Sequence, residues 1–143
     1  MKLYVLTKVP YHLDAVFEAM RDHMPSLADY MPNVASIEVQ SREDAEGEVR
    51  LVNRWTGAAT EIPAVARPFI QPDEIFWLDH AHWDNPGRIC RWRLEMGFMS
   101  ERIQCVGQTT YKAVGSMETE MLIEGELGLD LKGLLPRLML KPG

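Results

Sequence analysis

His80 and His82 are the residues whose type and spacing best suit chemistry in this sequence. They stand two apart in "IFWLDHAHWD", a predicted strand, so both side chains share one face. Two histidines in this arrangement can ligate a metal, but a third ligand is needed and no His or Cys is obviously placed to supply it. We therefore expect no metal site. General acid–base catalysis by one of them in a cavity is a second possibility, and a structural role is the commonest use of such residues.

The turn after this strand decides which face points inward, and it can be interpreted in two ways. If Asn85-Pro86-Gly87 is a three-residue loop, His80 and His82 lie inside beside Cys90 and Trp92. If Pro86-Gly87 is a two-residue turn, the opposite face is inside: Trp77, Asp79, Ala81 and Trp83. The sequence leaves both registers open. The catalytic candidates are accordingly His80, His82, Asp79 and, from a later strand, Tyr111.

Four tryptophans and nine methionines are the other notable residues. Tryptophan most often fills a core, but aromatic rings also form the walls of pockets for apolar ligands, and flexible methionines suit adaptable pockets. The alternation of the later strands predicts one apolar inner face. The residues expected to line a ligand cavity there are Trp55, Trp92, Leu94, Met96, Cys105, Thr109, Tyr111, Met121 and Ile123.

The two cysteines, Cys90 and Cys105, have neither metal-site spacing nor a disulfide framework. Both fall on the apolar face and have no basic neighbour in the sequence pattern to lower the thiol pKa, so we interpret them as unreactive buried thiols. Their use fits a reducing compartment. The N-terminus shows no apolar signal region, and together these features lead us to expect a cytoplasmic protein.

Composition narrows the possible partners. The formal net charge is −6 and the pI is about 5.2, so the basic surface that nucleic acid requires is absent and no nucleic-acid partner is expected. No apolar run approaches the ~20 residues of a membrane-spanning helix. Lys132, Arg137 and Lys141 are too few for stable attachment to a membrane surface. The expected partner is a hydrophobic small molecule, with no cofactor.

The elements that must position these residues follow from periodicity. Residues 3–9 alternate as a strand that Pro10 ends, and the next segment has a helical apolar stripe: Leu13, Val16, Phe17 and Met20. Ser26 is a candidate N-cap of a second, short helix. From Val34 onward the period is two, apart from residues 60–74, where three prolines predict an edge strand or an irregular crossing.

The predicted fold class is therefore α+β, in one domain over residues 1–143: a curved antiparallel sheet of six or seven strands, with two short N-terminal helices and a short C-terminal helix at 132–140. For the last hairpin, a three-residue loop at 114–116 would pair Ala113 with Met117 and Tyr111 with Thr119. This register places the glutamates of the final strand on the outer face.

The opening segment "LYVLTKVPYHLDAVFEAMRDHMPSLADYMPNVASIEV" and the closing segment "GELGLDLKGLLPRLML" resemble the START-related SRPBCC superfamily, which includes polyketide cyclases and lipid-transfer domains. The resemblance covers almost the whole chain, but it includes no catalytic signature. It implies a helix-grip fold, in which a curved sheet wraps a C-terminal helix around a cavity for an apolar ligand. The sequence departs from the pattern at this helix, which has only nine residues.

Three functions compete. The first is the binding or transport of a hydrophobic small molecule such as a lipid, an isoprenoid or a polyketide. The second is an enzyme of the polyketide cyclase/aromatase or dehydratase kind, which would need a His, Asp or Tyr in the cavity. The third is an interaction module whose open groove is filled by another chain.

The length of the last strand motivates the third function. Its apolar face from Met117 to Leu131 is about 50 Å long at the usual rise per residue, whereas nine helical residues span only about 13 Å. We therefore expect either a second chain across the groove, as in a homodimer formed through the C-terminal segment, or a natural chain that continues beyond Gly143.

Overall fold

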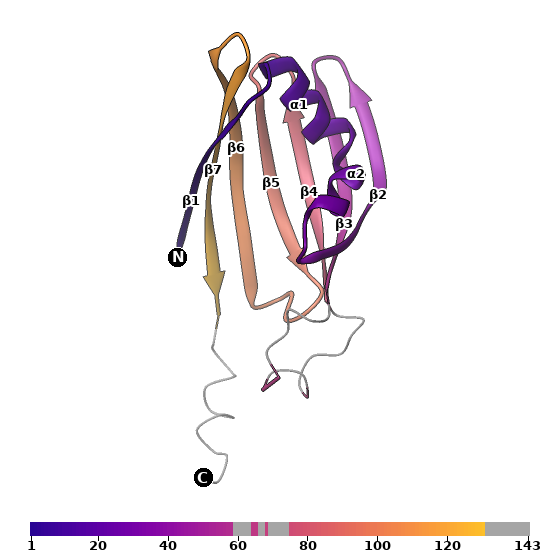
Figure 1. Ribbon diagram of the computed structural model, residues 1–143. Coiled ribbons are helices and arrows are strands. Elements are labelled where there is room, and N and C mark those ends of the chain that lie inside the picture. Colours follow the sequence, from indigo (N-terminus) through magenta and orange to yellow (C-terminus); the bar gives the residue numbers. More distant parts are fainter. Residues whose placement is uncertain (59–63, 66–67, 69–74, 131–143) are drawn as a thin grey trace.

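The computed structural model describes residues 1–58, 64–65, 68 and 75–130 of the chain. Two helices and a single 3-10 turn separate the first strand from the six that follow (Figure 1). The elements are β1 (Lys2–Val9), α1 (Leu13–Asp22), α2 (Met24–Leu27), the 3-10 turn (Ala28–Tyr30), β2 (Val34–Ala45), β3 (Glu48–Gly57), β4 (Phe76–Asp84), β5 (Ile89–Met96), β6 (Ile103–Gly115) and β7 (Glu118–Leu129).

All seven strands form one antiparallel sheet in the order β1-β7-β6-β5-β4-β3-β2. Consecutive strands from β2 to β7 are neighbours, and β1 closes the order by pairing with β7. The helices lie over one face of the curved sheet (Figure 1). The predicted α+β class and the predicted number of strands are confirmed. The expected crossing at 60–74 falls largely, and the expected C-terminal helix at 132–140 entirely, outside the described residues.

Helix α1 starts and ends at histidines. The Nδ1 atom of His12 accepts a hydrogen bond from the backbone N–H of Ala15 at 3.3 Å, and His23 is the C-cap. The predicted N-cap at Ser26 is wrong, because α2 begins at Met24 and contains Ser26. Pro25 does not break the helical path, since a proline in the first helical turn needs no hydrogen-bond partner for its nitrogen.

The β6–β7 hairpin has the predicted faces but not the predicted register. Ala113 pairs with Thr119 and Tyr111 pairs with Met121, so β7 is displaced by two residues from the expected pairing. A bulge between Ala113 and Gly115 tightens the turn, which a count of loop residues does not capture. Because the shift is even, every side chain keeps its face.

The β4–β5 hairpin settles the register that the sequence left open. Trp83 pairs with Cys90 and Asp79 pairs with Leu94, so the face with Trp77, Asp79, Ala81 and Trp83 points inward. The loop has four residues, 85–88. Because this number is even, as in the two-residue alternative, the same face of β4 points inward. The Oδ1 atom of Asp84 accepts a hydrogen bond from the N–H of Gly87 at 3.0 Å, and Arg88 has a φ of 54°.

The core lies where α1 meets the sheet. Phe17 is fully buried, and its ring makes edge-to-face contacts with Trp83 at 5.3 Å and with Tyr111 at 5.5 Å between centroids. Trp83 and Tyr111 stack on each other at 5.9 Å. Because such aromatic pairs add stability beyond the buried area, this cluster fixes α1 at one end of the concave face.

Trp92 lies next to two glycines on the neighbouring strands. Trp92 pairs with Gly107 on β6, which pairs with Gly125 on β7. A Cβ atom at Gly107 would lie 2.6 Å from Cζ2 of Trp92, and one at Gly125 would lie 2.8 Å from Cη2. The absence of side chains at these two positions lets the indole lie across both strands.

Replacing Gly107 by Ala should therefore destabilise the fold. The added methyl group would meet both the backbone oxygen of Glu124 on the paired strand and the indole of Trp92, and such overpacking costs about 1–3 kcal/mol of unfolding free energy. Gly128→Ala is the matched control in β7, because the nearest atom to its Cβ is a backbone oxygen 3.9 Å away. Urea unfolding measures both. Equal stability of the two variants would mean that the indole is not constrained by Gly107.

Candidate functional site

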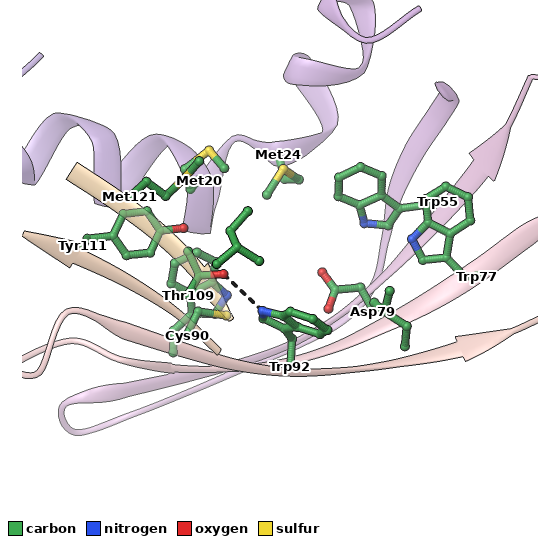
Figure 2. Close-up of a pocket in the computed structure, with 13 residues that line it drawn as sticks. Met20, Met24, Trp55, Trp77, Asp79, Cys90, Trp92, Thr109, Tyr111 and Met121 are labelled. Atoms are coloured by element: carbon green, nitrogen blue, oxygen red, sulfur yellow. Dashed lines mark hydrogen bonds between the residues drawn. The ribbon is translucent and has the colours of Figure 1, made fainter. Parts of the chain in front are cut away.

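A cavity of about 260 Å³ lies between the concave face of the sheet and the helices (Figure 2). Its volume is near the lower end of the range of about 300–1,000 Å³ for ligand pockets. The residues around it are almost all aromatic, aliphatic or sulfur-containing. They are Met20, Met24, Trp55, Trp77, Asp79, Trp83, Cys90, Trp92, Leu94, Thr109, Tyr111, Met121 and Ile123.

Most of the residues predicted to line a ligand cavity are brought together here: Trp55, Trp92, Leu94, Thr109, Tyr111, Met121 and Ile123. Met96 and Cys105 do not line it. Met96 pairs with Trp77 at the far end of β5, and Cys105 lies beside a separate hollow with Ile103 and Ser100. The even spacing along β5, β6 and β7 thus identified the face correctly but not how far along each strand the cavity extends.

Asp79 is the one acidic residue among the described residues that line the cavity. Its carboxyl group points into the space between Trp92 and Trp55 (Figure 2). The Oδ1 atom is buried and has no hydrogen-bond partner. Burial raises the pKa of Asp79 from the usual 3.8 to about 6, and no basic group offsets this rise. A carboxyl group in this state can hold or release a proton near neutral pH.

His80 and His82 lie on the opposite, outer face of β4. The Nε2 atom of His80 is 3.5 Å from Oε1 of Glu95, and that of His82 is 3.4 Å from Oε2 of Glu48. They take part in surface ion pairs when protonated, and neither lines the cavity. In the part of the chain that the structure describes, no group of three possible ligands could hold a metal ion.

Besides Asp79, the residues that line the cavity carry polar groups on Trp92, Thr109, Tyr111 and Cys90. The Nε1 atom of Trp92 donates a hydrogen bond to Oγ1 of Thr109 at 3.1 Å. The hydroxyl group of Tyr111 points into the cavity (Figure 2), and burial, followed by the nearby Cys90 and Asp79, raises the pKa of this phenol. The pKa of the Cys90 thiol is also raised, by burial and then by Asp79, so both groups are neutral at pH 7.

Sequence reasoning missed the helical side of the cavity. Met20 and Met24 come from α1 and α2 and face Trp55 and Tyr111 across the open space (Figure 2). Met20 belongs to the apolar stripe of α1, which periodicity identified without linking it to a cavity. Asn53, next to Asp79 on β3, was also missed. It is buried, and its Oδ1 atom has no partner. A single polar residue within an alternating strand was the available signal.

The architecture is shared with solved structures of low sequence identity. The Zhui aromatase/cyclase from a Streptomyces species is 17% identical over 90% of this chain and 68% of that chain, with a TM-score of 0.65. A protein from Thermus thermophilus is 20% identical over 97% and 84%, with a TM-score of 0.67. Norcoclaurine synthase from Thalictrum flavum is 14% identical over 95% and 75%, with a TM-score of 0.59.

These likenesses show the fold: the chain shares with these proteins an α+β architecture built on a curved antiparallel sheet, which is the fold that the sequence predicted. No family model and no curated protein matches the sequence itself. Among the described residues, no helix is both long enough and apolar enough to cross a membrane.

The buried carboxyl group predicts an unusual pH dependence of stability. Because the pKa of Asp79 is higher in the folded state, the unfolded chain loses this proton first as the pH rises from about 4 to about 6, and the free energy of unfolding falls. Asp79→Asn should therefore be more stable than the parent near pH 7.5, by about 1–3 kcal/mol, and nearly equal to it near pH 4.

Urea unfolding followed by circular dichroism at both pH values measures this difference. Glu95→Gln is the matched control, because it removes a carboxylate from the outer face of the neighbouring strand. A constant difference between Asp79→Asn and the parent at all pH values would show that Asp79 does not titrate with a raised pKa.

Proposed function

We propose that the protein binds a flat or elongated hydrophobic small molecule in the cavity under α1 and α2. The observation that carries this proposal is the composition of the cavity walls. The sheet contributes Trp55, Trp77 and Trp92, and the helices opposite contribute Met20 and Met24. The cavity is apolar, open at one side and large enough for a ligand of one or two rings.

The walls combine rigid and adaptable surfaces. Trp55 and Trp77 stack at 5.7 Å between centroids with an interplanar angle of 23°, and Trp92 is held by its hydrogen bond to Thr109. The rings supply large, flat contact surfaces at little entropic cost. The methionines opposite have several rotatable bonds and can adjust to different ligand shapes. Such a site selects for flatness and apolarity.

Solved structures with this fold support the proposal by analogy. Those named as aromatase/cyclases include Zhui and a di-domain protein of which this chain covers only 41%. A cavity in the same fold is consistent with a lipid, an isoprenoid or a polyketide-like ligand. Fold alone does not define function, so the argument depends on the residues of this cavity.

A second candidate function is proton-transfer catalysis, and Asp79 favours it specifically. An ionised Asp79 could remove a proton from a carbon next to a ligand carbonyl, and the resulting carboxyl group could return that proton to a hydroxyl leaving from the adjacent carbon. The net reaction is the elimination of one water molecule from the ligand, with formation of a carbon–carbon double bond. This is the chemistry of a dehydratase or an aromatising cyclase, and a pKa near 6 suits the two roles.

A larger side chain inside the cavity should weaken the binding of a hydrophobic ligand. Leu94→Trp adds a large ring beside Asp79 and should weaken the binding of a naphthalene-based fluorescent dye at least tenfold, because the ring occupies the space of the ligand. Val106→Trp is the matched control, since Val106 is 46% exposed on the neighbouring strand and does not line the cavity. Fluorescence titration measures both. Unchanged dye binding in Leu94→Trp would move the binding site elsewhere.

The two candidate functions are separated by Asp79→Asn. If the protein is a dehydratase, the variant should still bind a β-hydroxy ketone with a naphthyl group but lose at least a hundredfold in the rate of water elimination, because general acid–base catalysis contributes about 10²–10⁴-fold. Product formation is followed by absorbance. No elimination by the parent protein would leave binding as the function.

A further inference from the structure

The carboxyl group of Asp79 is unusual because its surroundings offer it no counter-charge. None of the described residues around the cavity is Lys, Arg or His. The cations of neighbouring strands are engaged elsewhere: Arg54 lies 3.9 Å above the ring of Phe76 on the outer face, and Arg93 is 4.0 Å from Glu95. The described residues around the cavity therefore include one potential negative charge and no positive one.

The groups that face Asp79 come from every element packed around it. Strand β3 presents Asn53 and Trp55, and β5 presents Cys90, Trp92 and Leu94. On the far side, β6 presents Thr109 and Tyr111, and the helices present Met20 and Met24. The titratable groups in this set are Cys90 and Tyr111, and both stay neutral at pH 7 because burial raises the pKa of each.

The aromatic rings complete the arrangement. The Asp79 carboxyl group points between the rings of Trp55 and Trp92, and Trp77 lies beside Trp55 (Figure 2). The face of an indole ring attracts a cation, and this attraction is stronger where the site is desolvated. Indole rings and a carboxylate without a protein partner can together bind an ammonium group whose remaining atoms are apolar.

We propose that the ligand of this cavity carries a cationic nitrogen, which lies between Trp55 and Trp92 with Asp79 as its counter-ion, while its apolar part contacts Met20, Met24 and Met121. The inference rests on the proposed function, because it names the chemical class of ligand for the same cavity. The ammonium group provides the charge partner that the described residues around the cavity do not supply.

This arrangement explains how the fold accommodates a buried carboxyl group. An ionised carboxylate without a partner is costly to bury, so the empty cavity favours the protonated form. A bound cation favours the ionised form instead, because an opposite charge at close range lowers a carboxyl pKa. Binding should therefore release a proton when the pH is below about 6.

Three matched probes test the proposal: naphthylethylamine, which is cationic, naphthylethanol, which is neutral, and naphthylacetate, which is anionic. Isothermal titration calorimetry near pH 7.5 should show the amine binding at least tenfold more tightly than the alcohol, and the acetate binding least tightly. Near pH 5 the affinity for the amine should fall about tenfold, because most of Asp79 is then protonated, whereas that for the alcohol should change little.

Asp79→Asn should remove the preference for the amine and leave the affinity for the alcohol within about twofold, because Asn keeps the shape of the side chain but not its charge. Glu95→Gln on the outer face should change neither affinity. If the alcohol binds as tightly as the amine to the parent protein, the cationic ligand is wrong and the proposed function stands. If none of the three probes binds, the proposed function itself is wrong.

Discussion

The position of the Trp92 indole is the constraint on which the rest of the concave face depends. Gly107 and Gly125 pair with each other on adjacent strands, and their missing side chains let the ring lie flat over β6 and β7. The hydrogen bond to Thr109 then fixes its direction. A side chain at either glycine would lift the indole into the cavity. The indole on β5 and the glycines on β6 and β7 together form this side of the cavity.

The opposite wall depends on how α1 is held. Phe17 packs into Trp83 and Tyr111, and Arg21 and Arg88 lie over its ring at 5.5 Å and 4.8 Å. Asp22 at the end of the helix binds Arg42 of β2 at 2.9 Å. These contacts anchor the helix at both ends of its buried stripe, so that Met20 packs against the core and also lines the cavity.

Sequence periodicity predicted which residues face inward, because charged and apolar residues alternate along most of β5, β6 and β7, with Val106 and Leu122 as apolar exceptions on the outer face. It could not predict the register of β4 against β5, since the same Asn-Pro-Gly signal fits loops of odd and even length and parity decides the face. Asp79 was therefore only one of two alternatives. The role of Gly107 and Gly125 was also inaccessible, because it arises from the pairing of three strands that are far apart in sequence.

Few of the atoms around the cavity are polar. Its apolar walls distinguish ligands by shape, and dispersion contacts with rings and thioethers are much the same for many flat molecules. The Thr109 hydroxyl already accepts the Trp92 hydrogen bond. The indole N–H groups of Trp55 and Trp83 have no hydrogen-bond partner among the described residues. Together with the Tyr111 hydroxyl and the Asp79 carboxyl they are polar groups around the cavity, and among these the carboxyl is the group whose charge changes near neutral pH. Asp79 therefore combines two properties: its burial destabilises its charged form, and it lies where its charge would meet whatever enters the cavity.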